Sequence, residues 1–192
     1  MTASVQRAKV VLDEEALRRT LVRIAHEIVE RNSDLAQVAL VGIHTRGVPL
    51  AQRLRTLVAR FVGSRVALGT LDITFHRDDL LVRAGEAPLH EQPVVRATEL
   101  DFPLDGTTCV LVDDVLHTGR TIRAAVEALF AYGRPARVEL ACLVDRGHRE
   151  LPIRPDYVGK NLPTARDERI QVQVVEVDEV DAVLLTSASE RG

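Results

Sequence analysis

One stretch constrains this chain more than any other. Residues 110–121 read Val-Leu-Val-Asp-Asp-Val-Leu-His-Thr-Gly-Arg-Thr, an apolar run, two carboxylates and a small polar turn. The apolar run predicts a buried strand. The residues after the turn predict an amphipathic helix whose apolar face carries Ile122, Ala125, Val126 and Leu129. A strand, a polar turn and a helix N-terminus together form a favourable place for a phosphate group.

The side chains of this stretch suit a ribose 5-phosphate with free 2′ and 3′ hydroxyls. Asp113 and Asp114 can accept hydrogen bonds from two neighbouring hydroxyls. The turn that is expected to hold the ligand comprises His117, Thr118, Gly119, Arg120 and Thr121. Alternatively, the aspartates only cap the next helix, but the Thr-Gly-x-Thr spacing favours the ligand site. The turn lacks the Gly-Lys-Ser/Thr ending of a nucleotide-binding P-loop, which argues against an ATPase.

The strand–turn–helix pattern occurs a second time. Residues 38–43 predict a strand and residues 48–61 a helix, with Thr45, Arg46 and Gly47 between them. Alternation of strands and helices predicts an α/β fold with a parallel sheet, whose ligands collect at the carboxyl ends of the strands. A hydroxyl, a guanidinium and a glycine in such a turn suit a pyrophosphate. The alternative is an ordinary connecting turn.

Length and composition narrow the class of protein. A chain of 192 residues suits a single domain, and 46% hydrophobic content is enough for its core. No apolar run is long enough to cross a membrane, and the N-terminus lacks an apolar secretory segment. Cys109 and Cys142 lie in apolar segments, which predicts buried free thiols and a cytoplasmic location. The histidines and cysteines show no metal-ligand spacing, so no transition-metal site is expected.

The remaining segments complete the expected organisation. Residues 13–32 predict a helix, and a polar loop is expected at 74–93. Further strands are expected at 65–74, 137–144, 156–159, 171–177 and 181–186.

Several of these segments together resemble one family. They are residues 13–32, 42–47, 72–80, 110–121 and 144–161, within a likeness that extends from about residue 9 to 180. The family is the bacterial pyrimidine operon attenuation regulator, which doubles as a uracil phosphoribosyltransferase. The most specific part is Asp-Arg-Gly-His-Arg-Glu-Leu-Pro-Ile-Arg at 145–154, followed by Tyr-Val-Gly-Lys at 157–160. The chain departs from the family at His117, where Tyr is frequent, and at Val22, where Thr occurs.

The resemblance implies a fold, a reaction and a set of site residues. It implies the type I phosphoribosyltransferase fold in one domain over 1–192, with the flexible loop at about 74–93. A small hood at about 146–170 would include the N-terminal lead-in. The reaction joins uracil to phosphoribosyl pyrophosphate (PRPP) and yields UMP and pyrophosphate, with Mg²⁺ carried by PRPP. The implied catalytic residues are Arg46, Arg77, Asp113 and Asp114, and the implied uracil contacts are Val144, Asp145 and Arg146.

The resemblance also implies a second role as an RNA-binding regulator. Its members bind the leader mRNA of the pyrimidine operon when UMP is bound. The candidate RNA contacts are Arg19, Arg23 and His26 on the first helix and Arg149, Arg154 and Lys160 in the hood. Charge alone leaves two alternatives for these six residues: they form one basic face, or they are scattered over the surface. The alternatives are a plain salvage enzyme without RNA binding and an attenuator with negligible catalysis.

Two further expectations come with the family. Its pyrophosphate turns often contain an unusual peptide bond, so we expect a cis bond between Thr45 and Arg46. A homo-oligomer, either a dimer or a tetramer, is also expected.

Overall fold

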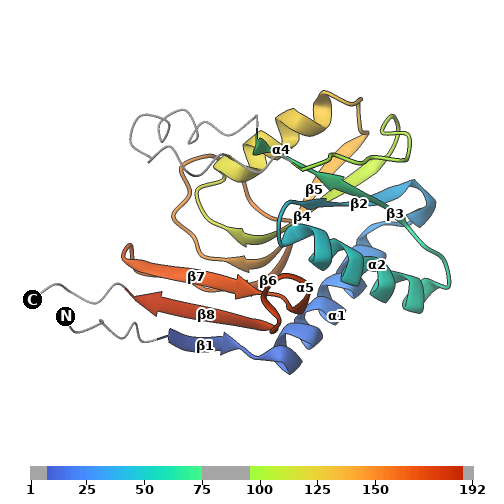
Figure 1. The fold of residues 1–192 in the computed structure, drawn as a ribbon. Coiled ribbons are helices and arrows are strands. Elements are labelled where there is room, and N and C mark those ends of the chain that lie inside the picture. The colour runs from blue at the N-terminus through green and yellow to red at the C-terminus, as the bar shows by residue number, and fades with distance from the viewer. Residues whose placement is uncertain (1–7, 75–95, 188–192) are drawn as a thin grey trace, which may run out of the picture.

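The computed structural model describes residues 8–74 and 96–187, which are coloured in Figure 1. The strands are β1 (Ala8–Leu12), β2 (Val38–Ile43), β3 (Ala67–Leu71), β4 (Thr108–Leu116), β5 (Arg137–Asp145), β6 (Tyr157–Asn161), β7 (Glu168–Gln173) and β8 (Ala182–Ser187). The helices are α1 (Glu14–Arg31), the 3₁₀ turn η1 (Leu35–Gln37), α2 (Gly47–Val62), α4 (Arg120–Phe130) and α5 (Val175–Asp178). The loop expected at 74–93 lies, except for Thr74, outside the described residues.

A five-stranded parallel sheet forms the centre of the molecule. Its order is β3-β2-β4-β5-β6, and all four strand pairs are parallel. Strand β2 is buried at every position, as the apolar run at 38–43 requires. Helices α1 and α2 cover one face and α4 covers the other (Figure 1). The structure thus confirms the α/β class and the expected parallel sheet.

Helix α1 begins where its sequence predicts. The Asp13 carboxylate accepts a hydrogen bond from the Ala16 N–H at 2.8 Å, and Glu14 and Glu15 occupy the first turn. Its apolar stripe, which includes Leu17, Ile24 and Ile28, is buried. Cys109 and Cys142 are buried free thiols, as expected.

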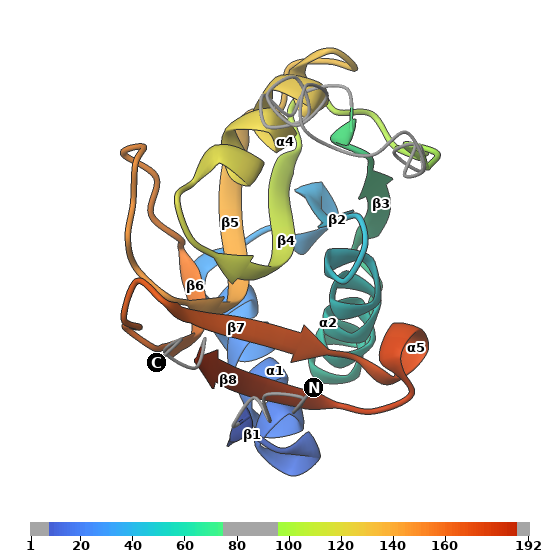
Figure 2. The same cartoon turned by 60° about the vertical axis from the view of Figure 1, so that its left-hand side comes forward.

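A second, antiparallel sheet in the order β1-β8-β7 lies next to the first. Figure 2 shows β7 passing beside the carboxyl end of β4, and the two strands are in contact. Strand β6, which lies within the segment 146–170, pairs with β5 in the central sheet, whereas β7 belongs to the second sheet. In the described part of the chain, no helix is long and apolar enough to cross a membrane.

The strand expected at 171–177 is wrong in its second half. Strand β7 ends at Gln173, and residues 175–178 form the short helix α5. The Val174 carbonyl accepts hydrogen bonds from the N–H groups of Val177 and Asp178, and the Asp178 carboxylate accepts from the Val174 N–H. This local turn replaces the strand because an aspartate near a helix start satisfies a free N–H group.

Candidate functional site

Residues 117–121, the phosphate turn, connect β4 to α4 at the carboxyl edge of the sheet. Gly119 precedes the helix with φ 93°, a left-handed conformation that favours glycine. Added bulk there would also approach the side chains of Leu151 and Ile153. Gly119 has no side chain to cap α4, and the Arg120 N–H donates only a long hydrogen bond, at 3.3 Å, to the Thr118 hydroxyl. The first turn of a helix leaves N–H groups without partners inside the helix. The geometry of the phosphate turn therefore suits an anion.

The two aspartates at the end of β4 are ordered by backbone hydrogen bonds. The Asp113 Oδ1 accepts from the Asp114 N–H at 2.9 Å, and the Asp114 Oδ1 accepts from the Val115 N–H at 2.8 Å. Burial raises the pKa of the Asp114 carboxyl, while the Val115 N–H and the charge of Arg46 oppose that rise. Carboxylate oxygens accept hydrogen bonds, so this pair suits the hydroxyls of a ribose.

Residues 44–47, the pyrophosphate turn, lie directly against β4. A Cβ atom built on Gly47 would lie only 2.2 Å from the Val112 carbonyl oxygen and 3.4 Å from the Asp113 Cα. Glycine is required here because the start of α2 touches the backbone of β4. The structure thus brings together the two turns that the sequence separates by about seventy residues.

A cis peptide bond does lie in the pyrophosphate turn, but not at the expected position. It joins His44 to Thr45 rather than Thr45 to Arg46. The His44 N–H still donates to the Leu71 carbonyl at 3.1 Å, so the sheet pairing extends one residue beyond β2. The chain reverses between this bond and the start of α2 at Gly47.

Arg46 is held by a carboxylate that sequence reasoning did not find. Its Nε and Nη2 donate to the two oxygens of Asp178 at 3.0 and 2.7 Å. The Asp178 carboxylate raises the pKa of the Arg46 guanidinium, and Arg46 in turn lowers the pKa of Asp178. The two residues are 132 positions apart, and no local pattern predicts such a pair. The other expected catalytic arginine, Arg77, lies outside the described residues.

A second missed residue is Arg96, which follows the undescribed segment. Its Nη1 donates to the Thr45 hydroxyl at 2.7 Å, and its N–H donates to the Asp72 carboxylate. The carbonyl of the next residue, Ala97, lies 3.3 Å from the His44 Nε2. Arg96 therefore adds a positive charge at the pyrophosphate turn, although no motif marks it in the sequence.

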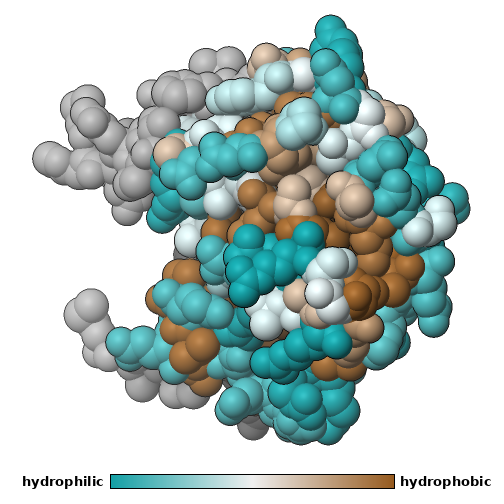
Figure 3. Space-filling view, turned by 90° about the vertical axis from the view of Figure 1, so that its right-hand side faces the viewer, coloured by the Kyte–Doolittle hydropathy of each residue, from teal (hydrophilic) through white to brown (hydrophobic). Residues whose placement is uncertain are grey.

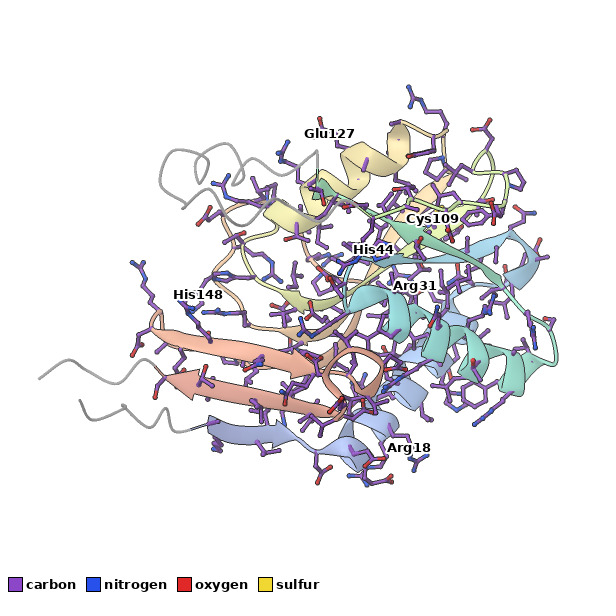
Figure 4. All side chains as sticks on the ribbon, viewed as in Figure 1. Arg18, Arg31, His44, Cys109, Glu127 and His148 are labelled. Atoms are coloured by element: carbon purple, nitrogen blue, oxygen red, sulfur yellow. The ribbon has the colours of Figure 1, made fainter. Side chains whose placement is uncertain are left out.

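A pocket of about 430 Å³ opens beside the phosphate turn. It is lined by His117, Arg146, His148, Arg149, Glu150 and Arg166. The rings of His117 and His148 meet edge to face with centroids 6.0 Å apart. Burial, followed by the charge of Arg146, lowers the pKa of His117. The positively charged lining suits an anionic ligand, and His148 projects between β7 and α4 in Figure 4.

Val144, Asp145 and Arg146 are expected to contact uracil, and part of their backbone already forms hydrogen bonds within the protein. The Arg146 N–H donates to the Leu116 carbonyl at 3.0 Å, and the Asp145 carbonyl accepts from the Leu162 N–H. The Arg146 side chain donates to the Thr164 hydroxyl and the Glu168 carbonyl. Val144 is buried within β5. Of the three residues, Arg146 lines the pocket, and its side chain is tied to the segment before β7.

Arg149 lies in the site rather than on an open basic surface. Its guanidinium donates to the carbonyls of His117 and Ile153 and to the Asp145 carboxylate, at 2.7, 2.8 and 2.5 Å. Its side chain is only 22% exposed. These contacts fix the phosphate turn to the segment 147–153, whose Glu150 N–H also donates to the Thr118 carbonyl.

The expected RNA contacts on α1 lie beside β6. Arg23 donates to the carbonyls of Val158 and Gly159 at 2.9 and 2.5 Å, directly before Lys160. Arg19 is exposed and pairs with Glu15 at 3.2 Å. Arg154 is exposed on the segment before β6. The structure thus places the α1 group beside the backbone of β6, the strand that carries Lys160, and His26 is exposed on the same helix. We call this surface of α1 and β6 the α1–β6 face.

Comparisons with known proteins agree with this arrangement of the site. A family model described as a phosphoribosyl transferase domain matches residues 8–179. A protein of Chloroflexus aurantiacus named bifunctional protein PyrR is 55% identical over 181 residues, which cover 94% of this chain and 96% of that protein. A bifunctional protein PyrR of Roseiflexus is 57% identical over 178 residues, with 92% and 94% covered.

Solved structures show the same fold at low sequence identity. A hypoxanthine phosphoribosyltransferase of Staphylococcus aureus superimposes with a TM-score of 0.67 at 17% identity, covering 94% of this chain and 93% of that one. The enzyme of Trypanosoma cruzi in complex with IMP gives 0.68 at 16% identity, covering 97% and 94%. At this identity, the likeness concerns the fold alone.

Proposed function

Since this chain belongs to the phosphoribosyltransferase family and, within it, to the bifunctional PyrR proteins, we propose that it has two coupled functions. It forms UMP from uracil and PRPP, and with UMP bound it binds the leader mRNA of pyrimidine genes and attenuates their transcription. The observation that carries the reaction is the contact of the pyrophosphate turn with β4 at Gly47, because β4 leads directly into the phosphate turn. It lets one PRPP molecule reach both turns at once.

The residues of the site divide the work of the reaction. Asp113 and Asp114 hold the ribose hydroxyls, and the N–H groups of the phosphate turn bind the 5′-phosphate. Arg46 and Arg96 lie beside the pyrophosphate turn, and their charges stabilise the leaving group as the glycosidic bond breaks. The pocket lined by Arg146, His117 and His148 receives the uracil ring next to Val144 and Asp145. The site accelerates the reaction by positioning uracil against PRPP and by stabilising the charge of the leaving pyrophosphate.

The donor set fits a Mg²⁺ ion that enters with its substrate. Within residues 8–74 and 96–187, no group of three or more His, Cys, Asp or Glu side chains could hold a metal ion. The half-buried Asp114 carboxyl would offer an oxygen ligand to a hard cation that enters with PRPP. When bound, the ion neutralises charge on the pyrophosphate.

Hydrogen bonds between the pocket and the α1–β6 face would couple nucleotide binding to RNA binding. The His148 Nε2 lies 2.6 Å from the Thr164 carbonyl, and Arg146 donates to the Thr164 hydroxyl, so the pocket is tied to the segment after β6. Strand β6 carries Lys160 and accepts hydrogen bonds from Arg23 on α1. A nucleotide that orders His148 would thereby order the α1–β6 face, and linkage requires RNA to tighten UMP binding equally.

We also propose that the chain acts as one domain in the cytoplasm and assembles into a homo-oligomer. Ion pairs join the two sheets, because Arg46 of the pyrophosphate turn pairs with Asp178 and Arg53 of α2 pairs with Asp181.

The experiment combines a turnover assay with an RNA titration on the same protein. We expect Mg²⁺-dependent UMP formation that a chelator abolishes and that Arg46→Ala slows. Leader RNA should bind more tightly with UMP, by roughly 5- to 150-fold for a typical coupling. Lys160→Ala should lose RNA affinity and keep turnover, because Lys160 does not contact the sugar site. RNA affinity that is indifferent to UMP would leave only the salvage reaction.

A further inference from the structure

Three arginines around the end of α2 have no role in the site described above. Arg55, Arg60 and Arg65 line a hollow of about 300 Å³ together with Thr56 and Ala59. Within the described part of the chain, none of these three side chains forms a hydrogen bond or an ion pair. Three like charges around one hollow repel each other, so the arrangement favours a negatively charged ligand.

The arginines of the neighbouring surface differ, because they are neutralised. Arg18 pairs with Glu15 at 2.7 Å and Arg23 with Glu27 at 2.5 Å. On α2 itself, Arg53 pairs with both Glu176 and Asp181. Among these arginines of α1 and α2, those at the hollow are therefore the ones without an acidic partner.

Helix termini offer another explanation for basic residues, but it does not cover this group. The carbonyl end of a helix favours cations in its last turn, and Arg60 occupies that position in α2. Arg55 lies in the middle of the helix, and Arg65 follows the helix end at Gly63. The helix dipole therefore accounts for one arginine of three.

The hollow is continuous with the α1–β6 face. His26 of α1 stacks on Phe61 of α2 with ring centroids 3.8 Å apart and planes at 13°. Arg18 and Arg60 line the same groove of about 260 Å³ between the two helices. Figure 3 faces the end of the molecule at which α2 terminates and shows hydrophilic and hydrophobic side chains interspersed over it. One stacked pair of rings thus lies where α1 and α2 meet, and Arg18 and Arg60 line the groove between the same helices.

We propose that Arg55, Arg60 and Arg65 bind phosphate groups of the RNA backbone and extend the RNA-binding surface from α1 across α2. This proposal rests on the RNA-binding function proposed above. A guanidinium binds phosphate through paired hydrogen bonds. The stacked His26 and Phe61 rings between the basic groups offer a platform for an unpaired base. RNA supplies both phosphates for the guanidinium groups and bases for the rings.

The test is a titration of UMP-bound protein with leader RNA over a range of salt concentrations. The triple variant Arg55→Gln, Arg60→Gln, Arg65→Gln should bind roughly tenfold more weakly at low salt. The slope of affinity against salt should fall by about 0.7 for each phosphate of single-stranded RNA that the variant no longer binds. The corresponding triple Arg→Lys variant should recover most of the slope, because the charges return. Uracil turnover and thermal stability should stay near wild type in both variants.

A matched control separates this surface from general charge. Arg134 follows α4 on the opposite face of the sheet and, like Arg60, is an exposed arginine near a helix end. Arg134→Gln should leave RNA binding unchanged, whereas Arg60→Gln should weaken it. If wild-type protein binds RNA and the triple variant keeps its affinity and slope, the extension across α2 is wrong. If wild-type protein binds no RNA at all, the RNA-binding function fails and this proposal fails with it.

Discussion

The two strand–turn–helix units of the site differ in what holds their turns. The phosphate turn after β4 is held mainly through backbone acceptors, since Arg149 donates to the His117 carbonyl and Glu150 to the Thr118 carbonyl. In the pyrophosphate turn after β2, the functional side chain itself is held, because Asp178 accepts two hydrogen bonds from Arg46.

This difference has a consequence for ligand binding. The phosphate turn can accept an anion with little rearrangement, because the Arg120 N–H at the start of α4 donates only a long hydrogen bond, at 3.3 Å, to the Thr118 hydroxyl. Arg46 has to exchange the Asp178 carboxylate, in whole or in part, for an incoming pyrophosphate. The phosphate turn is therefore preorganised for an anion. In the pyrophosphate turn, Arg46 has to exchange a carboxylate partner for the ligand.

The largest expected effect comes from forcing the two turns apart. Gly47→Ala would place a methyl group 2.2 Å from the Val112 carbonyl oxygen. We expect a loss of about 3 kcal/mol in the free energy of unfolding and no measurable turnover, because the start of α2 has to move away from β4. Urea denaturation and a turnover assay measure both effects. Gly63→Ala is the control, since its left-handed position costs stability but has open space, and its turnover should persist.

The next effect concerns the support of the phosphate turn. Arg149→Ala removes the hydrogen bonds to the His117 carbonyl and the Asp145 carboxylate. We expect unfolding to become easier by about 1.5–3 kcal/mol and turnover to fall roughly tenfold, since a displaced turn misplaces the sugar. Wild-type turnover in this variant, beside Lys160→Ala as a control, would return Arg149 to a purely RNA-binding role.

The case of Arg149 also shows how far sequence reasoning reaches. Strands, helices and both connecting turns follow from local patterns of apolar residues, carboxylates and glycines, and the structure confirms these elements except for the second half of the strand expected at 171–177. The role of Arg149 depends on a fold in which residues 147–153 pack on a turn some thirty positions earlier. Asp178 and Arg96 carry no local signal, because their partners Arg46 and Thr45 are brought to them only by the tertiary fold.

A smaller effect, on the affinity for pyrophosphate, tests whether Arg46 leaves Asp178 when the ligand binds. Asp178→Asn removes the charge that holds the guanidinium, so we expect pyrophosphate and PRPP to bind roughly threefold to tenfold more tightly. Isothermal titration with pyrophosphate and Mg²⁺ measures the change. The matched control is Asp181→Asn, which breaks the pair with Arg53 at the base of the same segment but leaves Arg46 untouched. Equal affinities in both variants and wild type would mean that Arg46 binds pyrophosphate without leaving Asp178.

The smallest effect lies in the pH dependence contributed by the phosphate turn. Burial and the charge of Arg146 lower the pKa of His117 in the folded protein, whereas the unfolded chain titrates near the usual value of about 6.5. Below that value the unfolded state binds more protons than the folded state, so this contribution to stability is complete above the usual pKa and is lost as the pH falls. His117→Gln removes the titrating group. Its urea midpoint should therefore change less than that of wild type between about pH 7.5 and 5.5. The same pH dependence in both proteins would show that His117 keeps its ordinary pKa, and that the cations around the phosphate turn do not act on it.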